Sequence, residues 1–119
     1  MKFIPKPTTI AAAGNKPKVI EEFVGAVNSK TSELSIARMK SPAGWMEPGQ
    51  RPDFDEYTVV LKGRLVIQSE KERLEVAAGQ AVIVPKGEWV QYSTPEETEY
   101  LAVCHPAFTP QHVHRDKTA

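Results

Sequence analysis

The sequence predicts an all-β domain folded as a closed antiparallel sandwich or barrel. Short β-favouring segments follow one another along most of the chain, and turns containing Gly or Pro separate them about every eight to twelve residues. A helical pattern is missing, apart from residues 110–115, which suffice for one turn. The same spacing of strands also fits an immunoglobulin-like sandwich, so two all-β architectures are open at this point.

Period-two alternation locates the expected strands. The strongest signal is residues 56–68, EYTVVLKGRLVIQ, which are rich in β-branched and aromatic residues and are interrupted by a turn at 62–63. Further strands are expected at residues 18–24, 33–40, 74–77, 81–84, 88–93 and 100–104. Residues 41–55 form a long connection rich in Pro and Gly, and a loop of that length in a small domain is often functional.

The domain organisation follows from the length of 119 residues, which fits a single domain. Residues 1–17 are expected to form an irregular N-terminal segment or an edge strand, residues 18–108 the barrel, and residues 109–119 a C-terminal tail. The irregular segment can cross to a second barrel and cover the edge of its sheet, so we expect a homodimer.

Composition excludes several classes of partner. Fifteen basic residues balance fifteen acidic ones, so the chain lacks the electrostatic footprint of a protein that binds nucleic acid or an anionic membrane. No apolar run approaches the roughly 20 residues of a membrane helix. The single cysteine, Cys104, excludes an intramolecular disulfide, and we therefore expect a reducing cytoplasm.

Two stretches carry a resemblance to a known family. The first is EYTVVLKG, with Glu56 and Gly63, and the second is GQAVIVPKGEWV, with Gly79, Pro85 and Gly87. Both resemble the paired motifs of the cupin superfamily, over about residues 35–108. The resemblance implies an antiparallel double-stranded β-helix, or jelly-roll barrel. The segments FDEYTVVLKG, VPKGEWVQYSTPE and YLAVCHPA are also similar to the EutQ type of cupin, without implying the same metabolic role.

The resemblance also implies a metal site that this sequence has altered. Cupins of this kind place His-x-His shortly before the motif glutamate and a further His after the second motif. The corresponding positions hold Gln50, Pro52 and Val90 here, so Glu56 alone remains of the four. Valine and proline cannot ligate a metal. We therefore expect no metal and no other cofactor.

Glu56 and Tyr92 are the candidate catalytic residues. Glu56 begins a strand in which Thr58 and Val60 share its face, and the cupin resemblance places that face inside the barrel. A carboxyl group in an apolar cavity should have a raised pKa and can act as an acid or base near neutral pH. A structural glutamate paired with an arginine, and a tyrosine that only packs in the core, are the alternatives.

Five further residues are candidates for ligand binding. Arg38 alternates with Leu34 and Ile36, which suggests an interior guanidinium for an anionic group, or else a side chain that reaches solvent. Val90 should share the face of Tyr92. The remaining candidates are Gln50 and Asp53 in the long connection and His114 in the tail, all of which are equally compatible with solvated positions.

These residues support three hypotheses about function. The first is a metal-independent isomerase, dehydratase or lyase that uses Glu56 as acid or base on a small polar or anionic molecule. The second is a non-catalytic domain that binds such a molecule. The third is a cupin in which Glu56 and unusual ligands hold a divalent ion weakly.

Overall fold

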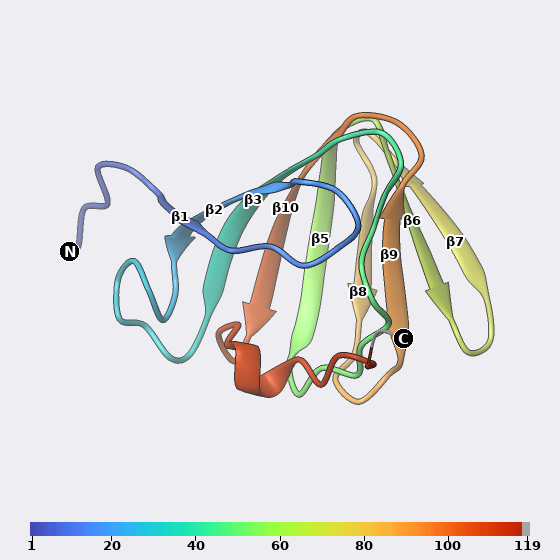
Figure 1. Cartoon of the computed structure of the whole chain (residues 1–119). Coiled ribbons are helices and arrows are strands. Elements are labelled where there is room, and N and C mark those ends of the chain that lie inside the picture. The colour runs from blue at the N-terminus through green and yellow to red at the C-terminus, as the bar shows by residue number, and fades with distance from the viewer. Residues whose placement is uncertain (118–119) are drawn as a thin grey trace.

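The computed structural model describes residues 1–117 and consists of two packed antiparallel sheets (Figure 1). The strands are β1 (Thr8–Ile10), β2 (Val19–Val24), β3 (Ser35–Ser41), β4 (Trp45–Met46), β5 (Asp55–Lys62), β6 (Arg64–Ser69), β7 (Arg73–Ala77), β8 (Ala81–Val84), β9 (Val90–Thr94) and β10 (Thr98–His105). One sheet has the order β1-β2-β3-β10-β5-β8 and the other has the order β4-β9-β6-β7. A single 3₁₀ turn, η1 (Pro110–His112), follows β10. The prediction of an all-β antiparallel domain is confirmed.

Alternation along the central strands determines which side chains face the space between the sheets. On β5, Glu56, Thr58 and Val60 are buried, whereas Tyr57 and Val59 are exposed on the outer face. This confirms the predicted face of β5. The neighbouring strand β10 is in register with it, Cys104 opposite Glu56, and buries every second side chain in the same way.

Apolar residues from both sheets form the core. The main cluster consists of Trp45, Val60, Leu65, Ile67, Val76, Val84, Val90, Tyr92, Tyr100 and Ala102. A second cluster, Phe54, Cys104 and Val113 with Phe108 against it, lies beneath the C-terminal segment. Burial of these side chains provides the main stabilisation of a domain of this size.

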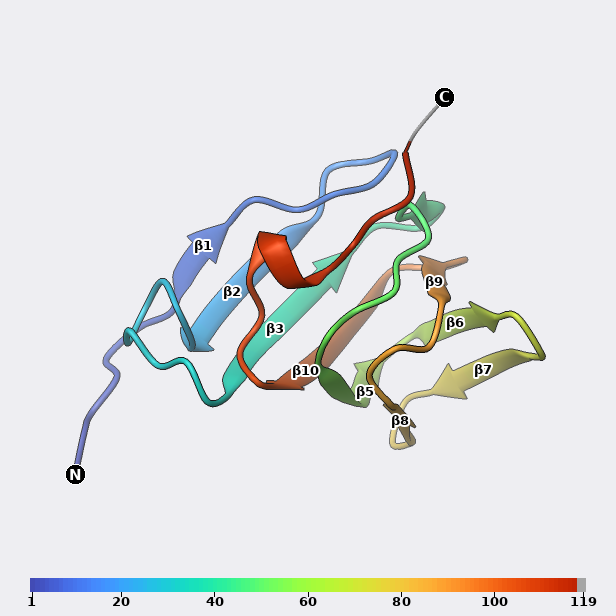
Figure 2. The same ribbon diagram turned by 90° about the horizontal axis from the view of Figure 1, so that it is seen from below.

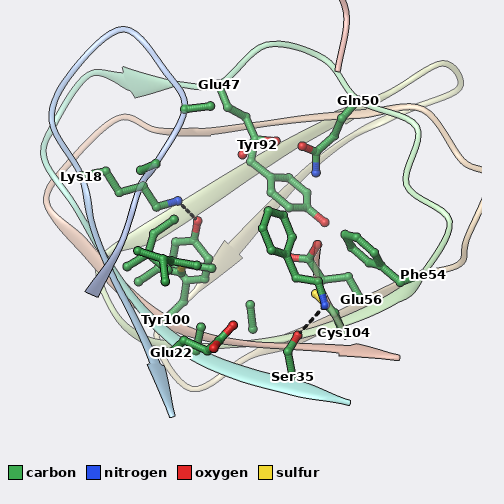
Figure 3. Close-up of a pocket in the computed structure, with 18 of the residues that line it drawn as sticks. Lys18, Glu22, Ser35, Glu47, Gln50, Phe54, Glu56, Tyr92, Tyr100 and Cys104 are labelled. Carbon is green, nitrogen blue, oxygen red and sulfur yellow. Dashed lines mark hydrogen bonds between the residues drawn. The ribbon is translucent and has the colours of Figure 1, made fainter. Parts of the chain in front are cut away.

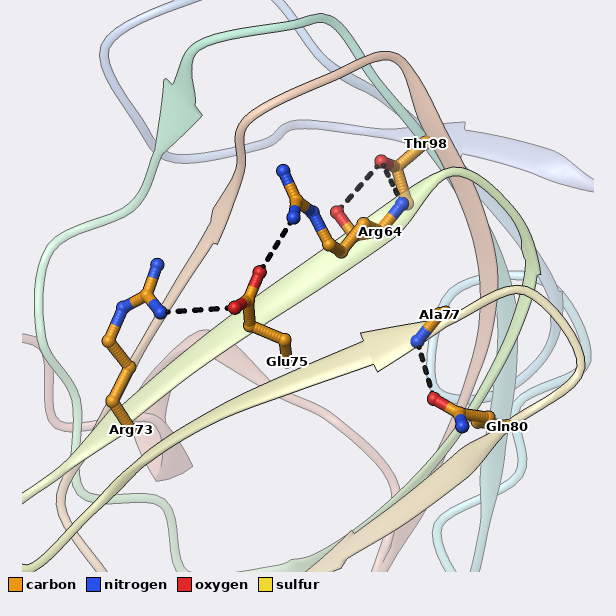
Figure 4. Close-up of polar contacts among 6 residues, drawn as sticks. All are labelled: Arg64, Arg73, Glu75, Ala77, Gln80 and Thr98. Atoms are coloured by element: carbon orange, nitrogen blue, oxygen red, sulfur yellow. Dashed lines mark hydrogen bonds and ion pairs between the residues drawn. The ribbon is translucent and has the colours of Figure 1, made fainter.

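Polar contacts fix the connections between the two sheets (Figure 4). The Thr98 hydroxyl lies 3.1 Å from the backbone N of Arg64 and 3.0 Å from its carbonyl oxygen, which ties the start of β10 to the start of β6. On the β6–β7 hairpin, Glu75 lies between two arginines, 2.9 Å from Arg64 and 3.4 Å from Arg73. These two ion pairs are exposed and stabilise the hairpin only slightly.

The N-terminal segment packs against its own barrel. Strand β1 is the edge of the larger sheet and pairs with β2 (Figure 1), and the segment between these two strands contacts β4. The Trp45 indole donates to the Ala13 carbonyl at 3.0 Å, and the Asn15 backbone N–H donates to the Met46 carbonyl at 3.1 Å. These bonds hold residues 11–17 beside the space between the sheets.

The C-terminal segment covers the same space from another side (Figure 2). The Asp53 backbone N–H donates to the His112 carbonyl at 2.8 Å, and the Asp116 N–H donates to the Gly49 carbonyl at 2.7 Å. Thr118 and Ala119, the end of the predicted tail, lie outside the described residues. Within residues 1–117, no helix has the length and apolar character needed to cross a membrane.

The structure contradicts the prediction that Arg38, on strand β3, faces the interior. The inward side chains are Ser35, Ala37 and Met39, whereas Arg38 lies on the outer face, where its Nε is 2.9 Å from a carboxylate oxygen of Glu21. Both faces of this strand alternate apolar with polar residues, so the local pattern was ambiguous. The inward face borders both the cavity and the core, because Ser35, Ala37 and Met39 line the cavity and Met39 also packs against the main core residues.

Candidate functional site

A cavity of about 60 Å³ lies between the two sheets (Figure 3). Strands β2, β3, β5, β9 and β10 contribute to its lining, together with the N-terminal segment and Arg115 of the tail. Its ionisable or amide-bearing side chains include Lys18, Glu22, Glu47, Gln50, Glu56 and Tyr92. The other lining residues are largely apolar or aromatic, so polar groups on a ligand would be recognised by this small set.

Glu56 is buried in the cavity wall, with an exposed fraction of 7%. Burial raises the pKa of its carboxyl group from 4.5 to about 7, against the opposing effect of the nearby Lys18 charge. At neutral pH the carboxyl group therefore exists in both protonation states. Such a group can accept a proton in one step of a reaction and return it in another.

Tyr92 reaches the same space from β9, in the opposite sheet. Its side chain is buried, and its hydroxyl has no hydrogen-bond partner among residues 1–117. Burial raises the pKa of the phenol, so the hydroxyl stays protonated and is available as a donor. Figure 3 shows Tyr92, Gln50 and Glu56 directed into one space. An unpartnered buried hydroxyl is costly, which indicates a position prepared for a ligand or water.

Gln50 is brought to the cavity, whereas Val90 lines the packed core beside it. The backbones of Gln50 and Val90 exchange two hydrogen bonds of 2.9 Å, which fixes the start of β9 against the long connection. The Gln50 side chain is buried and borders the cavity. Val90 belongs to the main core cluster and does not contact the cavity.

Asp53 and His114 are brought together, but on the surface. The Nε2 atom of His114 lies 2.6 Å from a carboxylate oxygen of Asp53, and both side chains are about half exposed. Neither residue borders the cavity. The contact joins the C-terminal segment to the long connection, so this placement favours a structural role over the predicted ligand binding for both. Arg38 is likewise outside the cavity, on the opposite face of its sheet.

Sequence reasoning missed Lys18, which precedes β2 by one residue. Its Nζ lies 2.5 Å from the Tyr100 hydroxyl and 3.6 Å from the centroid of the Trp45 ring. A signal for this placement exists, because Lys18, Ile20 and Glu22 alternate on one face and all three line the cavity. Lysine at the start of a strand is normally exposed, so that pattern gave no reason to expect a charged interior residue.

Glu47, in the long connection, was also missed. Its side chain is 9% exposed, and its Oε2 atom has no hydrogen-bond partner in the part of the chain that the structure describes. Burial raises the pKa of Glu47 and lowers the pKa of Lys18, while the attraction between their opposite charges opposes both shifts. Glu47 and Glu56 thus share the field of the Lys18 ammonium group, and Glu47 also lies in the field of the Arg115 guanidinium group.

Glu22 is a buried carboxylate with a structural function. Its Oε2 atom accepts hydrogen bonds from the backbone N–H groups of Val27, at 3.0 Å, and Asn28, at 2.7 Å. These bonds hold the turn between β2 and β3. Because two backbone N–H groups hold one of its carboxylate oxygens, the Glu22 side chain has a fixed position in the cavity wall.

The residues around Glu56 do not fit a metal ion. Gln50 supplies one amide oxygen, whereas Pro52 and Val90 supply no side-chain donor. No group of three or more His, Cys, Asp or Glu side chains within residues 1–117 has an arrangement that could hold a metal ion. The Lys18 ammonium group also acts on Glu47 and Glu56 electrostatically, so it would repel a divalent cation bound between them.

Two antiparallel sheets packed around a small cavity define a jelly-roll barrel, the fold of cupins. The structure is similar to that of a cupin superfamily protein from Desulfitobacterium hafniense, with a TM-score of 0.67 and 14% identity over 81% of this chain and 83% of that one. It is also similar to the polyketide cyclase RemF from Streptomyces resistomycificus, with a TM-score of 0.76 and 17% identity over 100% of this chain and 87% of that one. Identities at this level concern the fold alone. The predicted jelly-roll barrel is confirmed.

Residues 28–109 match the model of the family described as Ethanolamine utilisation protein EutQ, and the chain belongs to that family. A relative named Endoribonuclease YbeY, from Myxococcus xanthus, is 46% identical over 101 residues, which are 83% of this chain and 34% of the relative. Acetate kinase EutQ from Salmonella typhimurium is 34% identical over 55 residues, which are 46% of this chain and 24% of that protein. The matched part of the chain thus spans about a third of the first relative and about a quarter of the second.

Proposed function

We propose that the barrel binds a small polar molecule and that Glu56 transfers a proton to or from it without a metal, as in an isomerase, dehydratase or lyase. The observation that carries the proposal is the buried Glu56 carboxyl group, whose pKa is raised to about 7, in one cavity with the unpartnered Tyr92 hydroxyl. Perturbed acid groups that share a cavity with unused hydrogen-bonding groups are typical of catalytic sites.

In this proposal each polar group has one task. The Glu56 carboxylate accepts a proton from a carbon atom of the substrate and returns it at a different position. The Tyr92 hydroxyl donates a hydrogen bond to a substrate oxygen, and the Gln50 amide orients a second polar group. Water is largely excluded by the aromatic lining, which strengthens each of these electrostatic interactions.

The cavity limits the size of the molecule. A volume of about 60 Å³ has room for about four to six non-hydrogen atoms, taking about 10–15 Å³ for each atom the size of a water. A polynucleotide does not fit in the cavity, and the balanced charge of the chain gives no surface field for one, so neither feature favours the activity in the name of the Myxococcus relative, Endoribonuclease YbeY. Acetate, from the name of the Salmonella relative, is within the size limit.

Exchange of carbon-bound hydrogen with solvent tests the proposal. Hydroxyacetone, glycolaldehyde and pyruvate are incubated with the protein in D₂O, and loss of the C–H signal next to the carbonyl group is followed by proton NMR. We expect exchange with wild-type protein and a loss of at least about a hundredfold in Glu56→Gln. Glu21→Gln, on the outer face, is the control and should exchange normally. If wild-type protein binds these compounds without exchanging their hydrogen, the catalytic proposal is wrong and the chain is a non-catalytic binding domain.

Elemental analysis addresses the metal-bound alternative. We expect less than stoichiometric zinc, iron, nickel or manganese in dialysed protein, because one carboxylate and one amide hold such ions poorly. One equivalent of metal that disappears in Glu56→Gln would contradict the metal-free proposal.

We also propose that two chains associate through the outer face of the larger sheet. Tyr57, Val59 and Leu61 of β5 and Ile83 of β8 are exposed there and lie side by side, with Tyr57 in register with Ile83. A contiguous apolar patch of this kind favours a protein partner, and an isologous contact with a second copy is the simplest one.

The buried, unpaired Cys104 supports the further proposal of a reducing cytoplasmic location.

A further inference from the structure

We infer that the Lys18 ammonium group binds two oxygen atoms of a small 2-oxo acid. This inference rests on the proposed function, because it names the substrate class for the same cavity. It follows from the position of Lys18, the donors that its ammonium group has left over, and the size of the cavity.

The ammonium group has unused donors. A lysine ammonium carries three N–H groups, and one of them donates to the Tyr100 hydroxyl at 2.5 Å. None of the salt bridges formed by residues 1–117 involves Lys18. Lys18 borders the cavity, so two N–H donors are open to a ligand in that space.

Aromatic rings also hold the ammonium group in place. Its nitrogen lies 3.6 Å from the Trp45 ring centroid and 4.9 Å from the Tyr100 ring centroid. Contacts of this kind stabilise the charged form, because the face of each ring is electron-rich. A charged group away from bulk water and without a directly bonded counter-ion is costly, so a bound anion would relieve that cost.

A 2-oxo acid fits the two free donors. Its keto oxygen and one carboxylate oxygen lie side by side, and each can accept one N–H group from the same ammonium. The smallest members of the class have five or six non-hydrogen atoms, within the room for about four to six such atoms estimated above. Glu47 does not exclude the anion, because burial raises its pKa to about 8 and its protonated carboxyl group can accompany the anion while Glu56 is ionised.

The proposed placement gives Lys18 a chemical task. When the Glu56 carboxylate removes a proton from the carbon next to the keto group, the C–H electron pair becomes a C=C bond. The electron pair of the C=O bond moves to oxygen, which becomes the enolate anion, and the proton resides on Glu56. The Lys18 ammonium donates its hydrogen bond to that oxygen as the charge develops, which is the task of a Lewis-acidic metal elsewhere. Return of the proton completes the exchange, and no oxidant or further reactant is required.

Calorimetric titration with pyruvate tests the inference. We expect Lys18→Met to weaken pyruvate binding by about tenfold or more, because a charge-assisted hydrogen bond pair is lost. Lys16→Met is the matched control, since Lys16 lies on the same segment but bonds the exposed Ala43 carbonyl at 3.0 Å, and it should bind pyruvate as wild type does. Hydroxyacetone, which lacks the carboxylate, should bind to wild type more weakly than pyruvate does. The two compounds should bind to Lys18→Met with equal affinity.

A second measurement on wild-type protein keeps the test independent of folding in the variant. Pyruvate should protect Lys18 from reductive methylation, mapped by peptide mass spectrometry, while Lys16 continues to react. Equal pyruvate affinity in wild type and Lys18→Met, no pyruvate binding at millimolar concentration, or no protection of Lys18 would each overturn the inference. If the protein exchanges the hydrogen of hydroxyacetone and Glu56→Gln does not, the proposed function is supported even where the inference about Lys18 fails. The inference and the proposed function can therefore fail separately.

Discussion

Gly14 and Trp45 lie so close together that a Cβ atom on Gly14 would stand 2.3 Å from the indole Nε1 atom. That indole donates to the carbonyl of Ala13 at 3.0 Å and packs its ring against the Lys18 ammonium. The contact between a glycine in the N-terminal segment and a core tryptophan therefore fixes the segment that closes one side of the cavity.

Gly14→Ala should loosen this closure. Gly14 has a φ of +128°, so alanine is strained there, and its methyl group must also displace the Trp45 ring. We expect a loss of about 2–4 kcal/mol in the free energy of unfolding, with altered Trp45 fluorescence. Gly79→Ala is the control, because Gly79 also has positive φ but nothing lies within 4 Å of its Cβ position. Equal losses in both variants would show that the Trp45 contact is unimportant.

Stability should depend on pH through Glu56. The folded chain retains the Glu56 proton up to about pH 7, whereas an unfolded chain releases it near 4.5. The folded state thus binds more protons in that window, and the free energy of unfolding should fall as pH rises through it. Chemical unfolding should show a steeper fall for wild type than for Glu56→Gln, by up to about 1.4 kcal/mol per pH unit. Parallel pH profiles would mean that Glu56 is not buried in solution.

Adjacent glutamates on β2 should differ in their effect on stability. Glu22 is buried and accepts two backbone N–H groups, so Glu22→Gln replaces two charge-assisted bonds by neutral ones and should cost about 1–2 kcal/mol. Glu21 pairs with Arg38 on the outer face, and Glu21→Gln should remain close to wild type because such pairs stabilise little. Urea unfolding of the two variants measures the difference, and a larger loss in Glu21→Gln would contradict this account of β2.

Light scattering should distinguish a dimer from a monomer. Ile83 is 64% exposed on the outer face of the larger sheet, and Ile83→Lys should dissociate the proposed dimer by placing a charge in its apolar contact. Leu74→Lys, on β7 of the other sheet, is the matched control, with Leu74 41% exposed. A wild-type chain that stays monomeric at micromolar concentration would exclude the proposed association.

Much of the fold was predictable because it follows from local pattern. The period-two alternation of residues 56–68 predicted the central strands and the residues that share the face of Glu56, since a strand alternates its side chains whatever its neighbours are, and the resemblance to cupins implied that this face points inward. The position of Tyr92 followed in the same way. The inward face of strand β3 could not be predicted from alternation, because its two faces have similar apolar content. Only the pairing of β3 with β2 and β10 selects the face that points inward.

The sequence by itself determined the all-β class and the turn positions, and its resemblance to cupins implied the buried Glu56 carboxyl group and placed Gln50, Pro52 and Val90 where cupins of the usual kind have histidines. Each of these depends on residue identity or on neighbours along the chain. Only the tertiary structure brought Lys18 to Tyr100, 82 positions away, and placed Glu47 in the same cavity. Contacts between residues so far apart in the sequence form only when the strands pair and the two sheets pack. The pKa shifts of the cavity residues depend on those contacts.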